Sequence, residues 1–265
     1  MNAAGNAAYA EFALAVAREA GASILPHFRA PIAVDDKGGA KGYDPVTEAD
    51  RSAEAVIRQA IQRDYPGHGI EGEEQGVEPG TVAASWVIDP IDGTKSFILG
   101  QLHWATLIAL NDGTRPVVGV VHQPYVDESF VAFDRVSEWR RQGQRRRLAT
   151  RRCPRIEDAI VATTDPRHFV SPRQMHAWRA ATDGTRLVRY GGDCYCYTQL
   201  AMGLTDIVIE TGLQPYDVQA LIPLIEYAGG VITNWEGGSC QRGGDVLACG
   251  DPGLHAEILR RIALR

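Results

Sequence analysis

The stretch WVIDPIDGTKSF, residues 86–97, decides how this chain folds around its chemistry. Its apolar start predicts a short strand, and Pro90 cannot continue a central strand because proline has no backbone N–H. Residues 92–94 have the composition of a turn that begins a helix. Two carboxylates, Asp89 and Asp92, therefore leave a rigid strand three residues apart.

A turn of this kind can hold a metal ion and a phosphate together. Carboxylate oxygens suit Mg²⁺, which keeps several waters and binds through a few carboxylates plus substrate phosphate. The backbone amides of Gly93 and Thr94 follow the second aspartate, and amides at a helix N-terminus bind phosphate oxygens. Taken alone, the pattern is more often an acidic turn in which Asp92 caps the helix. The other motifs of the chain are needed to choose between a metal and phosphate site and a capping turn.

Three further acidic motifs occur in the chain: DPVTEAD at 44–50, GEEQG at 72–76 and PYD at 215–217. The glutamates Glu73 and Glu74 lie in a glycine-bounded loop just before the strand of the first motif. Either of them could complete a metal shell that the strand aspartates begin. In isolation, both would be residues of an exposed loop.

The remaining acidic residues have structural interpretations as well. Asp217 begins an apolar helix, where an aspartate commonly serves the helix dipole. Thr47 and Asp50 match a capping box at the start of the second helix. Capping and a functional role are compatible at these positions.

These four motifs, in this order and at these intervals, resemble the inositol monophosphatase superfamily. The resemblance covers nearly the whole chain, with Tyr216 standing where the family commonly has Trp before the last Asp. It implies two to three Mg²⁺ ions and hydrolysis by metal-activated water without a covalent enzyme intermediate. The implied metal ligands are Glu73, Asp89, the carbonyl of Ile91, Asp92 and Asp217.

The resemblance also implies roles for residues around the phosphate. The amides of Gly93 and Thr94 would bind the phosphate, and Asp50 would hydrogen-bond Thr94 and orient the attacking water with it. Asp50, Glu73 and Thr94 are therefore the predicted catalytic residues. Lys37, or Lys41 as the alternative, would close over the metals from the glycine-rich segment 35–43, which we expect to be a mobile loop.

Residues further from the phosphorus bear on the substrate. Lys95 and Ser96, with GGDCY at 191–195 and ETGLQPYD at 210–217, are similar to the histidinol-phosphate phosphatase branch, whereas the inositol branch more often reads DGTTNF. Histidinol phosphate has a cationic amine and an imidazole, so its pocket needs a carboxylate and aromatic rings. Asp193 could equally cap the following helix. The predicted substrate contacts are Asp193, Tyr195, Glu210 and Lys95.

Apolar periodicity predicts an α/β chain that forms one compact unit with two halves. Residues 1–185 form an α+β half with a mostly antiparallel sheet and most of the metal ligands. Residues 186–265 form a smaller α/β half that supplies Asp217 and the substrate pocket. The resemblance implies the αβαβα, sandwich-like layers of the inositol monophosphatase fold. Helices are expected at 7–28, 47–65, 174–181, 193–202, 218–227 and 254–262, and strands at 86–88, 104–110, 117–121, 129–133, 159–162, 186–189, 207–209, 230–233 and 246–249.

Composition limits the partners. A net charge of −6 and a pI near 5.7 give no general attraction for nucleic acid or for anionic membranes. The basic run at 140–152 lacks interleaved aromatics and is interpreted as a solvated hairpin or a subunit contact. Five cysteines without paired C-x-x-C units fit reduced thiols in a soluble, cytoplasmic protein. The resemblance implies a homodimer that acts on a small phosphorylated metabolite.

The leading hypothesis is a magnesium-dependent phosphomonoesterase that hydrolyses histidinol phosphate in histidine biosynthesis. Within the same superfamily, inositol-1-monophosphatase activity, a nucleotide bisphosphate substrate and a broad small-molecule phosphatase are the alternatives. A catalytically silent metal- or phosphate-binding protein is opposed by the complete carboxylate set. A nucleotide-dependent enzyme is opposed by the lack of a P-loop or a dinucleotide-binding glycine motif in the required context.

Overall fold

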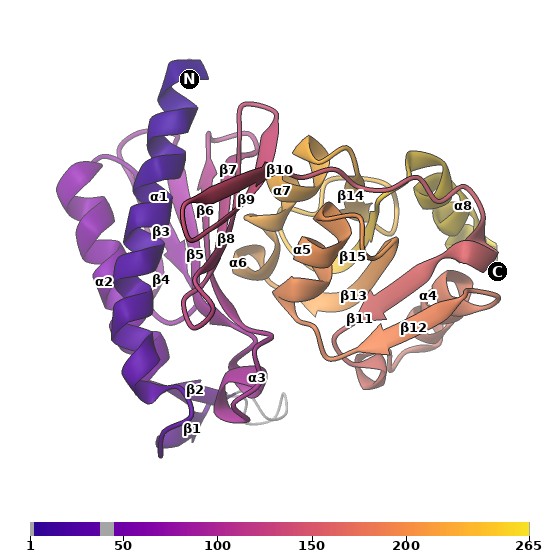
Figure 1. The fold of residues 1–265 in the computed structure, drawn as a ribbon, viewed down its shortest axis with the longest axis horizontal. Helices are drawn as coiled ribbons and strands as arrows, with labels where there is room; N and C mark the ends of the chain where they lie inside the picture. The colour runs from indigo at the N-terminus through magenta and orange to yellow at the C-terminus, as the bar shows by residue number, and fades with distance from the viewer. Residues whose placement is uncertain (1–2, 38–44, 265) are drawn as a thin grey trace.

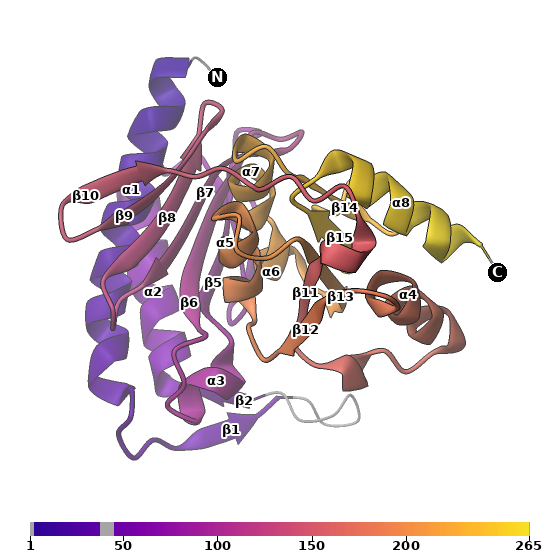
Figure 2. The ribbon, with the colours of Figure 1, turned by 45° about the vertical axis from the view of Figure 1, so that its right-hand side comes forward.

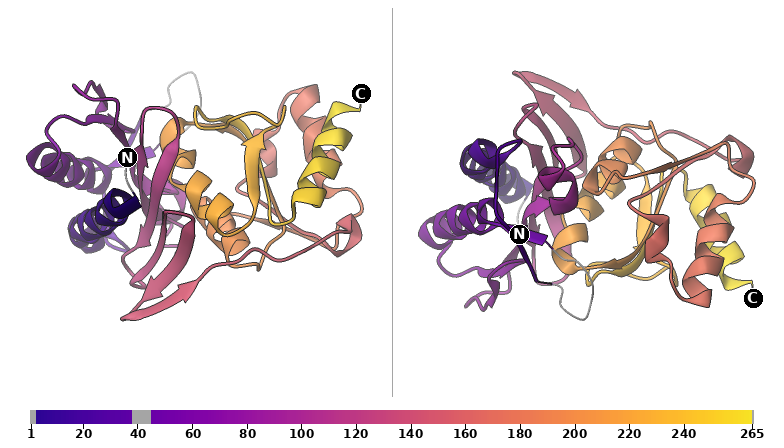
Figure 3. Two further views of the ribbon diagram at one scale, coloured as in Figure 1. Left: turned by 90° about the horizontal axis from the view of Figure 1, so that it is seen from above. Right: turned by 90° about the horizontal axis from the view of Figure 1, so that it is seen from below.

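The computed structural model describes residues 3–37 and 45–264, which form alternating layers of helices and sheets (Figure 1). From one side of the molecule to the other, the order is helices α1 and α2, a large sheet, helices α5 to α7, a smaller sheet, and helices α4 and α8 (Figure 3). This is the predicted αβαβα architecture. The helices are α1 (Ala3–Ile24), α2 (Glu48–Asp64), α3 (Thr94–Ile98), α4 (Pro172–Thr182), α5 (Cys194–Ala201), α6 (Pro215–Val218), α7 (Leu221–Tyr227) and α8 (Pro252–Ala263).

The large sheet has the strand order β10-β9-β8-β7-β6-β5-β3-β4. Its neighbouring strands are antiparallel except for β3 and β5, which are parallel, so the mostly antiparallel sheet of the prediction is confirmed. The basic run of the sequence falls on the β9–β10 hairpin at one edge of this sheet, in agreement with the expected hairpin. Its strands are β3 (Gly69–Gly72), β4 (Gly76–Glu78), β5 (Ser85–Asp92), β6 (Ala105–Asn111), β7 (Pro116–Gln123), β8 (Glu128–Phe133), β9 (Val136–Arg141) and β10 (Gln144–Arg147).

The smaller sheet has the order β12-β11-β13-β15-β14, with β11 parallel to both of its neighbours. Because β11 belongs to this sheet, the change from one sheet to the other falls between β10 and β11. Strand β11 and helix α4 precede residue 185, the predicted division between the halves, and they pack with the smaller sheet. The strands are β11 (Ile160–Thr163), β12 (Leu187–Tyr190), β13 (Ile207–Leu213), β14 (Val231–Asn234) and β15 (Gly244–Cys249).

Three apolar clusters fill the spaces between the layers. One joins α1 and α2 to the large sheet, with Trp86 and Trp104 fully buried in it. A second lies between the two sheets around α5 and α7, and a third lies between the smaller sheet and α4 with α8. The middle cluster contains residues of both sheets, which fixes the two sheets against each other.

Three local predictions were wrong. The segment expected to be a loop from residue 35 begins with strand β1 (Val34–Asp36), which pairs antiparallel with β2 (Pro45–Thr47) beside α3 (Figure 2). Lys41 lies outside the described residues. The helix expected at 218–227 is two helices, α6 and α7, and the strand expected to end before Pro90 continues to Asp92.

Over residues 3–37 and 45–264, no helix is long and apolar enough to cross a bilayer.

Candidate active site

Asp89 and Asp92 lie on the same side of β5 because the strand contains a bulge. Successive residues of a strand face opposite sides, so residues three apart would normally point away from each other. Asp89 lies opposite Leu107 of β6. Asp92 lies opposite Ala105, two residues earlier in β6, so β5 has one extra residue between its aspartates. The extra residue turns both carboxylates to one side, which is a common use of bulges beside active sites.

The bulge also explains how the strand passes Pro90. The hydroxyl of Thr106 donates to the carbonyl of Pro90 at 2.8 Å. The N–H of Ile91 donates to the carboxylate of Asp89 at 3.0 Å. Side chains therefore provide hydrogen bonds where Pro90 interrupts the backbone hydrogen bonds of the sheet. The sequence pattern did not indicate that side chains take over these bonds.

Two further carboxylates reach the same place from other elements. The parallel register sets Gly72 of β3 opposite Ile88 of β5, so Glu73, the next residue, is level with Asp89. Asp217 comes from α6, where its carboxylate accepts the N–H of Gln214 at 2.7 Å as a cap. Oxygens of the three aspartates, Asp89, Asp92 and Asp217, all lie within 4.8 Å of one another.

Burial and mutual repulsion govern the charges of these aspartates. Burial and the charges of Glu73 and Asp92 raise the pKa of Asp89 well above its usual range. Burial and the charges of Asp217 and Asp193 raise the pKa of Asp92 to about 8. Each carboxylate therefore resists ionisation near its neighbours unless a cation joins them.

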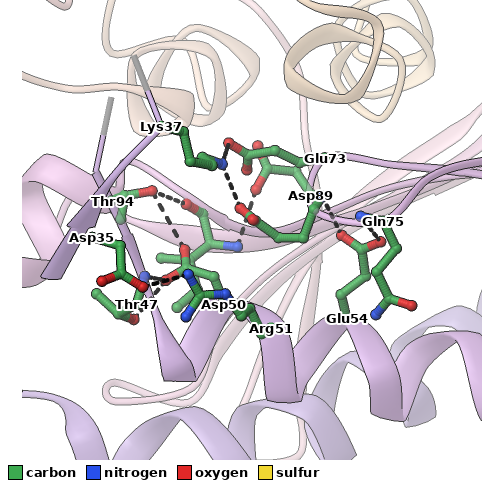
Figure 4. A network of polar contacts seen from close by, with 12 residues as sticks. Asp35, Lys37, Thr47, Asp50, Arg51, Glu54, Glu73, Gln75, Asp89 and Thr94 are labelled. Atoms are coloured by element: carbon green, nitrogen blue, oxygen red, sulfur yellow. Dashed lines mark hydrogen bonds and ion pairs between the residues drawn. The ribbon is translucent and has the colours of Figure 1, made fainter. Parts of the chain in front are cut away.

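Lys37 provides one such cation at the edge of the cluster. Its ammonium lies 3.0 Å from Glu73 and 2.7 Å from Glu74 (Figure 4). Burial raises the pKa of Glu73 to about 7 even though the charge of Lys37 opposes the shift. The predicted loop lysine is thus in contact with a predicted metal ligand.

Burial likewise raises the pKa of Asp217 to about 7, although the N–H of Gln214, which donates to its carboxylate, opposes the shift.

The Thr94 hydroxyl connects the turn after β5 to α2. It donates to the carbonyl of Ile91 at 3.1 Å and lies 3.5 Å from the carboxylate of Asp50. The other oxygen of Asp50 accepts both the N–H and the hydroxyl of Thr47, at 2.8 and 2.5 Å. The expected capping box and the expected Thr94–Asp50 contact are both present, and one buried carboxylate serves both.

The turn that carries Thr94 needs a glycine. Gly93 has a φ of 85°, which is left-handed backbone that residues with a side chain rarely adopt. A Cβ at this position would lie 2.5 Å from the carbonyl oxygen of His103. Gly93 therefore lets the turn pack directly against the segment before β6.

A pocket of about 470 Å³ opens beside these carboxylates, between β5 and the smaller sheet. A second pocket of about 580 Å³ adjoins it through shared lining residues. Among the predicted substrate contacts, Lys95, Asp193 and Glu210 line the first pocket, close to Asp92 and Asp217. The residues common to both pockets are Lys95, Thr164, His168 and Asp193.

Tyr195 faces elsewhere. Its ring lies in the buried core edge-on to Phe130, and its hydroxyl donates to Glu128 of β8 at 3.1 Å. The structure therefore separates Tyr195 from the other predicted substrate contacts. The GGDCY motif places Asp193 on the pocket wall and turns the tyrosine, two residues later on α5, into the core.

Several residues and contacts at the site were not predicted. Asp92 accepts the N–H of Cys194 at 2.8 Å, so a carboxylate of the large sheet caps a helix of the middle layer. His168 and Tyr197 line the pocket from segments with no motif. Glu54 of α2 accepts backbone N–H groups of the Glu73 loop. Of these residues, only Glu54 has a recognisable pattern in the sequence: it lies four residues before Arg58, the spacing of an ion pair on a helix.

Comparison with known proteins identifies the family. The model of the inositol monophosphatase family matches residues 6–263. The chain belongs to the inositol monophosphatase family. The resemblance inferred from the four acidic motifs is confirmed, and so is the fold that it implied.

Similar proteins include phosphatases with different names. The chain is 37% identical over 264 residues to the bifunctional phosphatase IMPL2 of Arabidopsis thaliana, covering 94% of this chain and 73% of that one. It is 34% identical over 220 residues to the histidinol-phosphatase of Mycobacterium tuberculosis, covering 82% and 84%. A solved inositol monophosphatase from Zymomonas mobilis superposes with a TM-score of 0.83 at 36% identity, covering 96% and 97%.

Membership of the inositol monophosphatase family makes the chain a phosphatase of small phosphorylated substrates, in a family that depends on metal ions. The site fits such ions, because its cluster offers only oxygen donors, and oxygen donors suit hard divalent cations. The raised pKa values of Asp89 and Asp92 give a second reason, since burial and mutual repulsion raise them and a bound cation would stabilise the ionised carboxylates.

Proposed function

We propose that this phosphatase hydrolyses histidinol phosphate to histidinol and phosphate, with Mg²⁺ as its metal, and so serves histidine biosynthesis. The observation that carries the proposal is the Asp193 carboxylate, which lies on the pocket wall next to the acidic cluster. A substrate with a cationic amine would place that amine against this carboxylate. A neutral polyol has no group that needs a charge there.

The backbone of Asp193 is held in an uncommon conformation. Its φ of 45° is left-handed, a region that costs free energy for a residue with a side chain. Its carboxylate accepts the hydroxyl of Ser96 at 2.7 Å, while Asp92 provides the cap for α5 in its place. Burial raises the pKa of Asp193, and a cation in the pocket would favour its ionised form. These features support a binding role over the capping alternative.

The rest of the pocket supports the same substrate. Glu210 accepts the N–H of Thr164 at 2.6 Å and the hydroxyl of Thr163 at 3.1 Å, so its carboxylate is fixed at the pocket wall. Burial raises its pKa to about 8. The exposed ring of His168 lines the same space and offers a flat surface to an imidazole, whereas Tyr197 borders the pocket from the buried core.

The chain's own residues define the chemistry at the phosphate. In the proposed site, Glu73, Asp89, Asp92 and Asp217, with the carbonyl of Ile91, would hold the Mg²⁺ ions. Bound there, the ions would polarise the phosphoryl oxygens and lower the pKa of a water.

The residues after β5 would orient the substrate and the water. The amides of Gly93 and Thr94 would donate to the phosphate oxygens. The Thr94 hydroxyl, fixed between Ile91 and the buried carboxylate of Asp50, would accept or pass a proton of the attacking water. The pair would thus orient the nucleophile, and Lys95 would contact the substrate from the pocket wall.

A panel of phosphomonoesters tests the proposal. We expect the highest kcat/KM for histidinol phosphate, with inositol 1-phosphate and a nucleoside bisphosphate well below it. Phosphate release should stop when metal is chelated and return when Mg²⁺ is added. An equal or higher kcat/KM for inositol 1-phosphate would overturn the substrate assignment but leave the phosphatase in place.

Two related expectations can be measured with the same preparation. Release of phosphate from none of the esters would favour a catalytically silent binding protein. Light scattering after size-exclusion chromatography would show whether the chain is a homodimer, which stays a prediction from the resemblance.

A further inference from the structure

Helix α2 presents three charged residues to the interior on a single face. Asp50, Glu54 and Arg58 follow each other at four-residue spacing, which puts them on one side of a helix. Asp50 and Glu54 are fully buried and Arg58 is 6% exposed. Charged side chains are seldom this buried, so the positions need a reason beyond solubility.

The carboxylate of Glu54 binds the backbone of the loop that carries Glu73. It accepts the N–H of Glu74 at 2.7 Å and the N–H of Gln75 at 2.9 Å (Figure 4). The same carboxylate accepts Nε of Arg58 at 2.8 Å. The guanidinium of Arg58 in turn donates to the carbonyl of Gly76. The two side chains therefore hold the three-residue turn between β3 and β4 by its main chain.

The strand before the turn leaves room for this contact. A Cβ at Gly72 would lie 2.4 Å from Oε1 of Glu54 and 2.8 Å from Nη2 of Arg58. The glycine therefore lets the ion pair approach the backbone next to Glu73. Loop, glycine and ion pair form one packed unit.

The same face of α2 also reaches the other side of the site through Asp50, which contacts Thr94 at 3.5 Å. One rigid helix thus fixes two segments that are far apart in sequence. We infer that Glu54 is a positioning residue, which sets the Glu73 carboxylate relative to Asp89 and so sets the affinity for the metal. This inference rests on the proposed role of Glu73 as a metal ligand.

The inference differs from a purely structural role for the ion pair. A structural pair would stabilise the fold without a specific effect on metal binding. A positioning pair changes metal affinity, because residues that orient a ligand typically contribute roughly 10- to 100-fold to it. Metal affinity of the metal-free chain is therefore the measurement that separates the two roles.

The test is calorimetric titration of the metal-free full chain with Mn²⁺, comparing wild type with Glu54→Gln. The glutamine keeps the volume but offers one oxygen and an NH₂ group to three donors, so the loop loses at least one bond. We expect Mn²⁺ affinity to fall roughly 10-fold or more. Hydrogen exchange at the amides of Glu74 and Gln75 should become faster, at an unchanged circular dichroism spectrum.

A matched control comes from the other carboxylate near Arg58. Glu78 lies 3.6 Å from Arg58 with its side chain 48% exposed, so Glu78→Gln removes a neighbouring charge without touching the Glu73 turn. Its Mn²⁺ affinity should equal that of wild type. Glu73→Gln provides the reference for loss of the ligand itself. Wild-type affinity in Glu73→Gln would refute the proposed ligand set, whereas a loss in Glu73→Gln with none in Glu54→Gln would refute the positioning role alone.

Folding failure of Glu54→Gln would not end the test. Removing Glu54 alone leaves the buried Arg58 with only the more distant, half-exposed Glu78 as a counter-charge, whereas replacing both charges is much better tolerated. The double variant Glu54→Gln/Arg58→Met lacks both charges and still lacks the loop contact. We expect the same loss of Mn²⁺ affinity in it, and wild-type affinity in this folded variant would overturn the inference.

Discussion

At its acidic end, the pocket is lined by Asp92 of β5 and by Glu73 of the turn after β3, and Asp89 of β5 lies beside them. On the adjoining wall, it is lined by Lys95, His168 and Asp193, which come from three separate segments. Local features fix the acidic end: a bulge, a parallel register and the cap that Asp217 forms. Packing of α3, the segment before α4 and the start of α5 fixes the adjoining wall.

In the proposed site, this difference would separate the reaction from the choice of substrate. The groups proposed to act on phosphorus depend on the spacing within short motifs, so they stay together as long as the strand does. The groups proposed to contact the rest of the substrate depend on how three segments meet. Phosphatases named for different substrates could then share the acidic end and differ on the adjoining wall.

The largest effect should come from the acidic end. Asp92→Asn removes a charge from the aspartate cluster and weakens the cap on α5, so kcat should fall roughly 10²- to 10³-fold at saturating Mg²⁺. Steady-state phosphate release measures it. Asp158→Asn, the same change at a side chain that is 58% exposed, is the matched control. Wild-type turnover in Asp92→Asn would contradict the assignment of the reaction to this cluster.

A smaller, selective effect should come from the adjoining wall. Asp193→Asn keeps an acceptor for Ser96 and nearly the same side-chain size, but it removes the charge. A hydrogen bond to a charged group contributes about 1.5–3 kcal/mol, so kcat/KM for histidinol phosphate should fall roughly 10- to 100-fold. Inositol 1-phosphate is the control substrate and should change little. An equal loss for both esters would place Asp193 in the reaction instead of in substrate choice.

The metal should stabilise the chain more at higher pH. Unfolded carboxyl groups titrate near pH 4, whereas burial raises the pKa of Glu73 and Asp217 to about 7 and of Asp92 to about 8. The folded metal-free chain thus binds more protons between about pH 4 and 8, and its free energy of unfolding falls as pH rises through that range. Divalent cations bind the ionised carboxylates, so their contribution grows over the same range.

Differential scanning calorimetry with and without Mg²⁺ measures this effect. At 100 times Kd, ligand binding stabilises by about 2.7 kcal/mol, or roughly 5–10 °C in Tm for a chain of this size. We expect that increment at pH 8 and a much smaller one at pH 5, with NaCl at equal ionic strength as the control. An increment that does not change with pH would show that the acidic cluster is not where Mg²⁺ binds.

The smallest effect on catalysis should come from Tyr195→Phe. The hydroxyl donates to Glu128 inside the protein, away from the pocket. Its removal should cost about 1 kcal/mol in the free energy of unfolding, while kcat/KM for histidinol phosphate stays within about twofold of wild type. Urea denaturation and steady-state kinetics measure the two quantities. A tenfold rise in KM would restore Tyr195 as a substrate contact.

Much of the fold could be predicted because apolar periodicity reports burial directly. The helix over residues 47–65 and the strands around β5 to β8 have clear patterns and were found. Strands β3 and β4 were missed because they are short and glycine-bounded, so that pairing with a neighbouring strand defines them. The basic run was expected to form a hairpin, but the bounds of β9 and β10 were not predicted because these strands are rich in arginine. The position of β11 in the smaller sheet also depends on pairing between segments distant in sequence.

The site shows the same limit. The carboxylates could be named from their motifs, but the reason that Asp89 and Asp92 face one way is the bulge, which appears only in the register with β6. Tyr195 follows Asp193 by two residues, and no pattern in the sequence indicates that Asp193 faces the pocket and Tyr195 the core. The spacing of Glu54 to Arg58 indicates only a helical ion pair, because the other partners of Glu54 are backbone N–H groups of a distant loop.

Asp217 belongs to α6 in the middle layer, whereas Asp89 and Asp92 belong to the large sheet, so their cluster spans two parts of the chain. A cation bound among them would be a removable cross-link that closes a long stretch of sequence, as a disulfide does. Such a link would slow the separation of the layers it joins and so lengthen the time before irreversible unfolding. The lifetime of the folded enzyme, as well as its turnover, should therefore depend on the concentration of metal ions.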